Sequence, residues 1–299
     1  MTGPGCWAGR RAAGSRISPG QSGLTILRRM IPFLHLGPVE IPTFGLMVAA
    51  AMLAAFYLLR GDMARRGLAP KESGAAEGFI AIPSLVGIAG AKLYHALQTP
   101  QELFAHPFEQ IFSRYGLAWF GGLIAGVAAF AAMARWRKIP LLEMFDAGSP
   151  AAALGYGVGR IGCLLSGDGD YGVPTSLPWG MSFPNGLVPT DQRVHPTPIY
   201  ELIVACIIAW ALWRIGARQV AASGSENRAK AKTEYAGVPP RGSVFAAYLA
   251  LTGLARFLVE FIRINPRSFL GMTNAQAASL LSILAGIFLW WRVHRAKVA

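Results

Sequence analysis

Charged side chains inside apolar segments are the groups of this sequence best suited to chemistry. Arg160 lies in an apolar stretch, after Gly155, Gly157 and Gly159 and before Gly162. A charged residue at the centre of a membrane helix costs about 2.5–3.5 kcal/mol on insertion scales, so its presence needs a reason. Glycines at this density let backbone and ligand approach closely, and a guanidinium binds phosphate through two parallel hydrogen bonds. We interpret Arg160 as an anion-binding residue; an arginine that reaches from a helix end to the interface is the structural alternative.

A second apolar segment contains the pair Arg256 and Glu260. Residues four places apart share one face of a helix, and inside a membrane such a pair is expected to line a polar cavity rather than to face lipid. A purely structural ion pair is the alternative. Arg263 follows closely, and Pro266 then ends the helix. With Arg160, these arginines predict a cavity that binds an anionic headgroup.

Two polar segments supply further candidates. The Gly/Asp-rich turn at 166–172 follows Arg160, and the segment His-Pro-Thr-Pro-Ile-Tyr-Glu at 195–201 suits a helix entrance, where proline is favoured. Glu201 then lies one turn into that helix. A histidine at the position of His195 is more often a hydrogen-bonded cap than a base.

The cysteines give no sign of a metal site. Cys6, Cys163 and Cys206 show no metal-ligand spacing and support no disulfide framework. The rest of the sequence also implies no metal or organic cofactor.

The composition defines the class of protein. Charged residues make up 14% of the chain, against roughly 25% in soluble domains, while apolar residues make up 53%. The net charge of +13 could indicate a nucleic-acid partner. The basic residues, however, are scattered between apolar runs and form no stripe, so we expect no nucleic acid and predict an integral membrane protein.

Apolar windows of about 20 residues predict the helices that must position these side chains. A helix of this length crosses a bilayer core. Charge-free windows cover 41–59, 115–134 and 268–291. Four further segments carry embedded charges, at about 78–98, 143–165, 198–216 and 243–263. The prediction is an all-α fold of seven transmembrane helices with a central lipid-binding cavity.

The distribution of basic residues predicts the orientation. Lysine and arginine gather after the first, third and fifth spans and at the C-terminus, whereas the loops 99–114 and 166–197 are poor in them. By the positive-inside rule the C-terminus is cytoplasmic and the first span starts outside. Residues 1–29 contain five arginines on the wrong side, so translation starting at Met30 is the preferred reading and a disordered extension the alternative. We expect one membrane domain at 30–299, with the loops 166–197 and 218–242 too small to bury a core.

A series of different short motifs follows along the chain. They are Phe44-Gly45-Leu46-Met47, Gly90-Ala91-Lys92-Leu93, Gly121-Gly122-Leu123-Ile124, Gly159-Arg160-Ile161-Gly162, His195-Pro196-Thr197 with Tyr200-Glu201, Arg256-Phe257-Leu258-Val259-Glu260, and Gly271-Met272-Thr273 with Gln276. Over residues 30–295 this order resembles the bacterial prolipoprotein diacylglyceryl transferases.

The resemblance implies an activity and partners. Members of this family transfer the diacylglyceryl group of phosphatidylglycerol to the lipobox cysteine thiol of a prolipoprotein signal peptide, so that a thioether forms and glycerol phosphate leaves. It implies a bacterial inner-membrane enzyme with Arg256 and Glu260 as its catalytic pair and Arg160 at the headgroup. The other substrate-binding positions that it implies are Gly162, Asp168, Gly172, His195 and Glu201.

The chain also departs from the family pattern. Phe44 and Thr252 replace tyrosines, Phe120 replaces a histidine, Cys163 an asparagine and Pro198 a glutamine. A divergent enzyme with the same activity fits these changes. So do a paralogue that acts on another acceptor or lipid, and a non-catalytic lipid-binding or transport protein.

The acceptor thiol must lose a proton to become a good nucleophile, and Phe120 cannot take it. The candidates are Glu260, Asp168 or Asp170, and His195. We favour Glu260, because desolvation makes a carboxylate more basic, although its arginine neighbour acts in the opposite direction.

Overall fold

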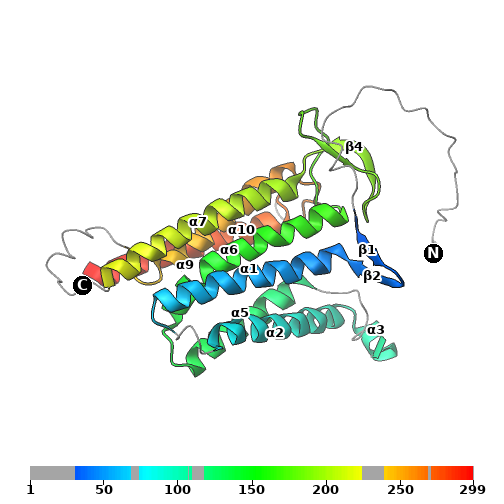
Figure 1. The fold of residues 1–299 in the computed structure, drawn as a ribbon. Coiled ribbons are helices and arrows are strands. Elements are labelled where there is room, and N and C mark those ends of the chain that lie inside the picture. Colours follow the sequence, from blue (N-terminus) through cyan, green and yellow to red (C-terminus); the bar gives the residue numbers. More distant parts are fainter. Residues whose placement is uncertain are drawn as a thin grey trace, which may run out of the picture.

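Long helices dominate the computed structural model, which describes residues 31–68, 74–106, 108–109, 118–223, 239–268 and 271–298 (Figure 1). The basic segment 1–29 lies outside the described residues, as does most of the linker predicted at 218–242. In chain order the elements are β1 (Phe33–Leu36), β2 (Val39–Pro42), α1 (Thr43–Arg65), α2 (Ala75–Gln98), α3 (Pro100–Ala105), α5 (Trp119–Trp136), α6 (Leu141–Ser166), β3 (Met181–Phe183), β4 (Thr190–Val194), α7 (Thr197–Ser223), α9 (Ser243–Val259), a 3-10 turn (Glu260–Ile262) and α10 (Asn274–Val298).

Each predicted span coincides with a helix, but the helices are not equivalent. Among the described residues, six are long and apolar enough to cross a membrane, namely α1, α2, α5, α7, α9 and α10. The helix α6 is 26 residues long and contains Glu143, Asp146 and Arg160. It packs against α1, α7 and α9, so protein rather than lipid surrounds much of it. The structure thus shows a mostly helical, multi-pass membrane protein. The hydropathy of α6 does not by itself identify it as a membrane-spanning helix.

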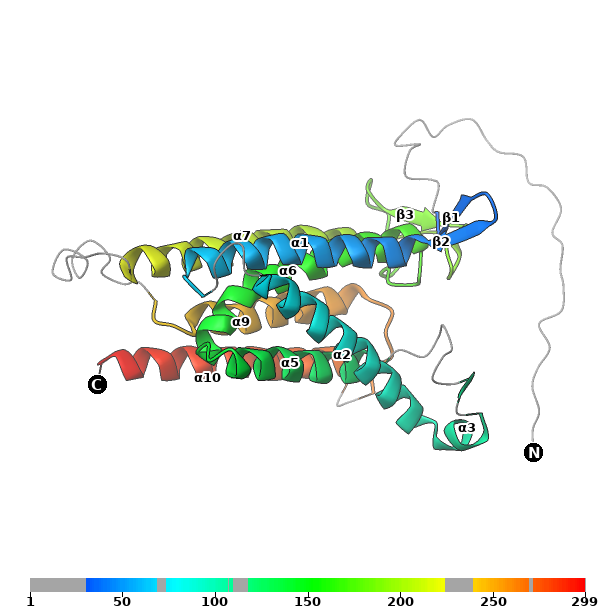
Figure 2. The ribbon, with the colours of Figure 1, turned by 60° about the horizontal axis from the view of Figure 1, so that its bottom comes forward.

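The helices α2 and α5 form a closely packed pair, with α2 running on towards α3 (Figure 2). A Cβ atom on Gly90 would lie 2.7 Å from the carbonyl oxygen of Gly121, so neither backbone leaves room for a side chain at this crossing. In lipid, where burying apolar surface gives no advantage, such close packing of small residues drives helix association. The glycine motifs of the second and third predicted spans therefore serve packing.

A buried apolar cluster joins this pair to the rest of the bundle. It includes Leu59 and Met63 of α1, Phe79 of α2, Met133 of α5 and Met144 of α6. These residues lie towards the end of the bundle at which α1 and α5 finish and α2 and α6 begin. The cluster fixes the two parts to each other at that end.

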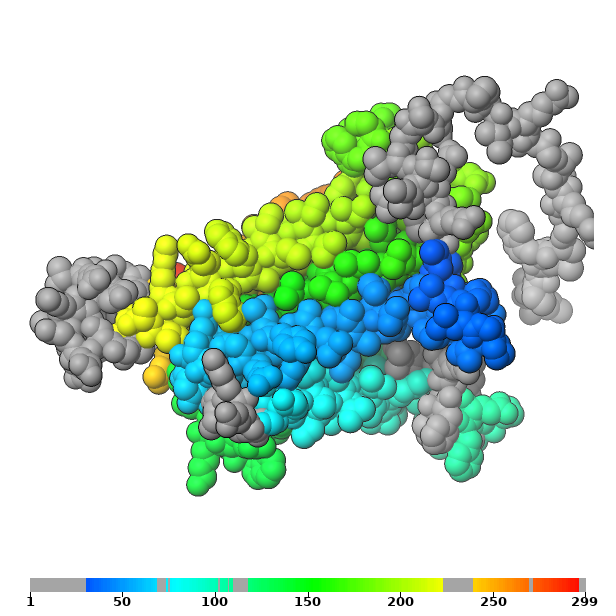
Figure 3. All heavy atoms as spheres, viewed as in Figure 1, coloured from blue at the N-terminus to red at the C-terminus, as the bar shows by residue number. Residues whose placement is uncertain are grey.

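Two antiparallel hairpins, β1–β2 and β3–β4, lie at the other end of the bundle, which we call the hairpin end (Figure 1). In the space-filling view the β1–β2 hairpin projects beyond α1 (Figure 3). Tyr171, Phe183 and Val194 form a small buried cluster beside β3 and β4. The prediction that the 166–197 loop could bury no core is therefore wrong, because two stacked aromatic rings suffice for a local one.

Candidate active site

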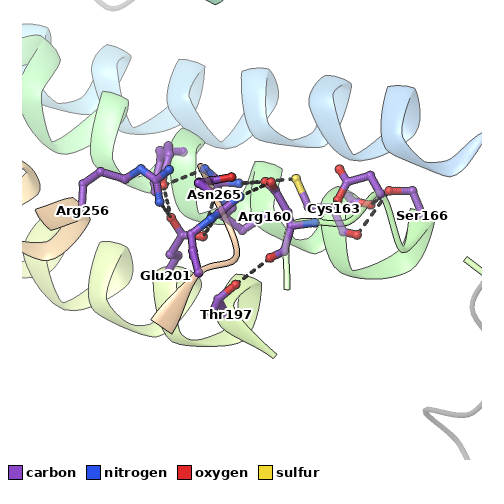
Figure 4. Close-up of polar contacts among 12 residues, drawn as sticks. Arg160, Cys163, Ser166, Thr197, Glu201, Arg256 and Asn265 are labelled. Carbon is purple, nitrogen blue, oxygen red and sulfur yellow. Dashed lines mark hydrogen bonds and ion pairs between the residues drawn. The ribbon is translucent and has the colours of Figure 1, made fainter. Parts of the chain in front are cut away.

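A buried carboxylate, Glu201 on α7, joins the predicted charged residues at the hairpin end (Figure 4). Its Oε1 accepts a 2.5 Å hydrogen bond from the Tyr156 hydroxyl and lies 3.4 Å from Arg256 Nη1. Its Oε2 lies 3.4 Å from both Arg160 Nε and Arg263 Nη1. One carboxylate from the fifth predicted span thus meets three guanidiniums from two other helical segments.

A second carboxylate, Asp170 in the loop after α6, holds two of the same arginines. One of its oxygens accepts from Arg160 Nη1 and the other from Arg263 Nη2. Burial alone would raise the pKa of Asp170, but these two guanidiniums outweigh it and lower the pKa below its usual value of 3.8. Asp170 is therefore ionised and paired at neutral pH.

The third carboxylate, Glu260, starts the 3-10 turn after α9. Its Oε2 lies 2.8 Å from Arg256 Nη2 in an ion pair that lacks hydrogen-bond geometry, and 3.8 Å from Arg263 Nε. Its Oε1 accepts a 2.6 Å hydrogen bond from Asn265 Nδ2. The sequence spacing of Arg256 and Glu260 thus corresponds to a real ion pair, and its carboxylate side chain has no exposed surface.

Backbone contacts bring these distant segments together. Gly172 forms an isolated antiparallel bridge with Arg263, and the Val173 amide donates to the Ile262 carbonyl at 2.8 Å. The buried Thr197 hydroxyl donates to the Asp170 carbonyl at 2.6 Å. The loop after α6 is therefore tied to both α7 and the end of α9, and this loop carries Asp170 to the arginines.

Two predicted substrate-binding residues, Gly162 and Gly172, allow other parts of the chain to approach their backbone closely because they have no side chain. A Cβ on Gly162 would lie 3.1 Å from Met47 Cβ and 3.2 Å from Phe44 Cδ2, so Gly162 lets α1 pack on α6. A Cβ on Gly172 would lie 2.5 Å from the Ile262 carbonyl oxygen. The structure accounts for both glycines by packing.

His195 lies in a separate aromatic group. Its Nδ1 is 3.2 Å from the Tyr200 hydroxyl, which also accepts a 2.8 Å hydrogen bond from Trp179 Nε1. No contact of the His195 ring with the three arginines is seen among the described residues. His195 is therefore a hydrogen-bonded residue, as expected, and its part in proton transfer stays a prediction.

Asp168 and Cys163 lie at the edge of the cluster. The Cys163 sulfur is 3.6 Å from Arg160 Nη1 and within 4.8 Å of an Asp168 carboxylate oxygen. Burial, and then the charge of Asp170, raises the pKa of Asp168. Ligand atoms of Cys163, Asp168 and Asp170 lie within 4.8 Å of one another, a spacing that a cation could use. Two guanidiniums already bind Asp170, and their charge disfavours a cation at this position.

The cluster is balanced in charge but uneven in exposure. Three arginines face the three carboxylates Asp170, Glu201 and Glu260. The side chain of Arg256 is 25% exposed and that of Arg160 is 15% exposed, against 6% for Arg263. An anion can therefore reach Arg256 and Arg160 most directly, while Arg263 is enclosed by carboxylates.

Comparisons with known proteins identify the family. A sequence model of the prolipoprotein diacylglyceryl transferases matches residues 32–292. The chain belongs to the prolipoprotein diacylglyceryl transferase family. It is 30% identical to the phosphatidylglycerol–prolipoprotein diacylglyceryl transferase of Geobacter sulfurreducens, over 89% of this chain and 96% of that protein. It is 31% identical to the protein of that name from Clostridium tetani, over 84% and 93% of the two chains.

The structure shows where the departures from the family pattern lie. Phe44 lies against Gly162, and Phe120 packs edge-to-face on Trp119 at the start of α5. The Thr252 hydroxyl donates to the Tyr248 carbonyl of its own helix at 2.6 Å. By contrast, Cys163 contacts Arg160. In this member of the transferase family, the change at 163 is thus the one seen to touch the arginine cluster in the described part of the chain.

Sequence reasoning missed two side chains of the site. Tyr156 hydrogen-bonds both Glu201 and Arg160, at 2.5 and 2.8 Å, and its position one helical turn before Arg160 could have revealed it. Asn265, which directly precedes Pro266, donates a hydrogen bond to Glu260. No spacing rule predicts that contact, because it depends on how the chain turns after Ile262.

Proposed function

We propose that this chain transfers the diacylglyceryl group of phosphatidylglycerol to the lipobox cysteine thiol of prolipoproteins, forming a thioether and releasing glycerol phosphate. The observation that carries the proposal is the convergence of Arg160, Arg256 and Arg263 on Glu201 within a bundle of membrane-length helices. Family membership and the names of the relatives support the same activity.

The proposed chemistry depends on the two more exposed arginines. The leaving glycerol phosphate needs its oxygen charge stabilised, and preorganised guanidiniums do this best in a site with little water. A guanidinium has five N–H donors, and at Arg256 the carboxylates engage only Nη1 and Nη2, each once. Arg256 therefore keeps N–H donors for a phosphate, while Glu260 and Glu201 fix its orientation. At Arg160 all three nitrogens already have partners, and Nη2, which contacts only the Tyr156 hydroxyl, keeps one N–H for a phosphate.

We also propose the topology in which this site works. With α6 as a seventh span, the two ends of the membrane domain lie on opposite sides, and the hairpin end faces outward from a bacterial inner membrane. The N-terminus is then outside and the C-terminus cytoplasmic. Support comes from the basic residues Arg65 and Arg135, which end α1 and α5 away from the site. A lipid headgroup of the outer leaflet and a secreted signal peptide are both available on that side.

Transfer in a defined membrane tests the proposal. The purified full chain is placed in vesicles that contain phosphatidylglycerol, with a peptide bearing a lipobox cysteine, and the peptide is analysed by mass for a thioether-linked diacylglyceryl group. The expected result is product with this peptide and none with its cysteine-to-serine counterpart. Turnover only with another acceptor, or lipid binding without turnover, would replace the proposal by the corresponding alternative.

A further inference from the structure

The site has four carboxylates, and three of them are engaged with arginines. Asp170 binds Arg160 and Arg263, Glu201 contacts all three guanidiniums, and Glu260 pairs with Arg256. The oxygens of these carboxylates already lie against guanidinium nitrogens, so an incoming thiol would have to displace an arginine to reach them. These three residues are therefore suited to orient arginines rather than to take a proton.

Asp168 is different in its partners and its exposure. Among the described residues it is the carboxylate of this group without an ion pair, and its Oδ1 accepts a 3.2 Å hydrogen bond from the Asp170 amide. It is partly exposed in the loop that follows α6, whereas the side chain of Glu260 has no exposed surface. A substrate group that enters the site can reach Asp168 but cannot reach Glu260 without rearrangement.

Cys163 shows how a thiol fits beside Asp168. Its sulfur lies 3.6 Å from Arg160 Nη1 and within 4.8 Å of an Asp168 carboxylate oxygen. A thiol in this corner thus meets a proton acceptor on one side and a guanidinium on the other. The acceptor cysteine of a peptide needs the same two neighbours, one for its proton and one for the phosphate that its attack displaces.

We infer that Asp168 is the group that accepts the proton of the acceptor thiol, an assignment that rests on the proposed function. The thiol proton passes to an Asp168 oxygen, and the sulfur electron pair forms the C–S bond with the glycerol carbon. The C–O bond to the phosphate breaks, and its electron pair stays on the oxygen of the departing glycerol phosphate. Asp168 then releases its proton to water. The sequence favours Glu260 for this step, but in the structure the Glu260 side chain has no exposed surface, whereas Asp168 is partly exposed.

The charged surroundings of Asp168 agree with this role. The titratable groups facing it are Cys163 and Arg160 of α6 and Asp170 of its own loop. Burial and the neighbouring Asp170 raise the pKa of Asp168, and the weaker influence of Arg160 lowers it. In its ionised form, a carboxylate with a raised pKa is a stronger base than an ordinary aspartate.

The test measures turnover against pH for the full chain in phosphatidylglycerol vesicles with a lipobox peptide. Asp168→Asn should lower the rate near pH 7 by roughly 100-fold or more, the usual contribution of a general base. Its rate should then rise about tenfold per pH unit towards the thiol pKa of about 8.5, where the peptide loses its proton unaided. Asp168→Glu should keep most of the activity, and Asp191→Asn, on the same connection but exposed, should match the wild type.

Three results would overturn the assignment. The first is an Asp168→Asn rate within about threefold of the wild type near pH 7, and the second is a deficit that stays constant with pH, which indicates a structural role. The third is recovery at alkaline pH by Glu260→Gln instead. A wild-type protein that forms no thioether product would overturn the proposed function itself, and with it this assignment.

Discussion

Two clusters of buried charge lie at opposite ends of the bundle, built from the same residue types and differing in access. At the hairpin end the side chains of Asp170 and Arg256 are 30% and 25% exposed. At the other end the side chain of Asp62 has no exposed surface and that of Arg66 is 3% exposed. The first cluster thus has a carboxylate and a guanidinium that are both partly exposed. In the second, the carboxylate is fully buried and Arg65 is 17% exposed.

The contacts of the enclosed cluster explain its role. Asp62 accepts hydrogen bonds from Arg65 and from Arg66 Nε, the latter at 2.9 Å. Arg66 reaches Gln219 on α7, and Gln219 donates to the Pro240 carbonyl at 2.9 Å. These bonds join α1, α7 and the segment before α9. This cluster therefore ties helices together around a fully buried carboxylate, whereas the cluster at the hairpin end keeps accessible charge.

The largest effect should come from Arg160→Ala at the accessible cluster. We expect transfer to fall at least 100-fold with the protein still folded and inserted, because a preorganised donor to the phosphate is lost. Arg160→Lys should also be poor, since an ammonium lacks the bidentate geometry. Turnover in vesicles and the amount of inserted protein measure this. Near-normal turnover by the alanine variant would remove Arg160 from the headgroup site.

Asp62→Ala in the enclosed cluster should have the opposite effect to Arg160→Ala. It should lower stability and leave turnover unchanged. It leaves buried guanidiniums without their carboxylate, at a cost of about 3–5 kcal/mol in the free energy of unfolding. The rate per folded molecule should stay close to that of the wild type. Thermal unfolding in detergent, combined with turnover normalised to folded protein, separates the two quantities. A selective loss of turnover in a stable protein would contradict the assignment of this cluster to structure.

A smaller effect, dependent on pH, is expected at Asp170. Its pKa is lowered in the folded protein, so the stability that it contributes is present above the unfolded value near 3.8 and is lost as the pH falls through the lower folded value. Asp170→Asn should therefore be less stable than the wild type at neutral pH. The difference in melting temperature should shrink as the pH falls below about 4. A difference independent of pH would mean that the ion pairs of Asp170 do not stabilise the fold.

The smallest effect should come from His195→Gln. The His195 ring bonds the Tyr200 hydroxyl outside the arginine cluster, and an amide can replace that hydrogen bond. Turnover should stay within about threefold of the wild type, with an unchanged dependence on pH. A loss as large as that of Asp168→Asn would move the proton acceptor to His195.

The sequence predicted the parts of this structure that depend on local pattern. Apolar windows located the helices, and the spacing of Arg256 and Glu260 gave their ion pair. The contact of Arg263 with Asp170 joins residues 93 positions apart, so no periodicity could reveal it. The hairpin β3–β4 escaped prediction because its strands span only three and five residues, too few for an alternating pattern. The hydropathy of α6 is too low to identify it as a membrane-spanning helix, because neighbouring helices rather than lipid cover much of it.

The glycine crossing of α2 and α5 has a consequence for how the protein is made. The two helices are consecutive long helices in the chain, and their contact at Gly90 and Gly121 needs no other part of the bundle. Helices that associate through close backbone packing can do so in the bilayer once both are inserted. The pair can thus assemble during synthesis before the segment that contains Arg160 has been translated. The polar α6 would then enter a membrane in which α1 and this pair are already present as partners.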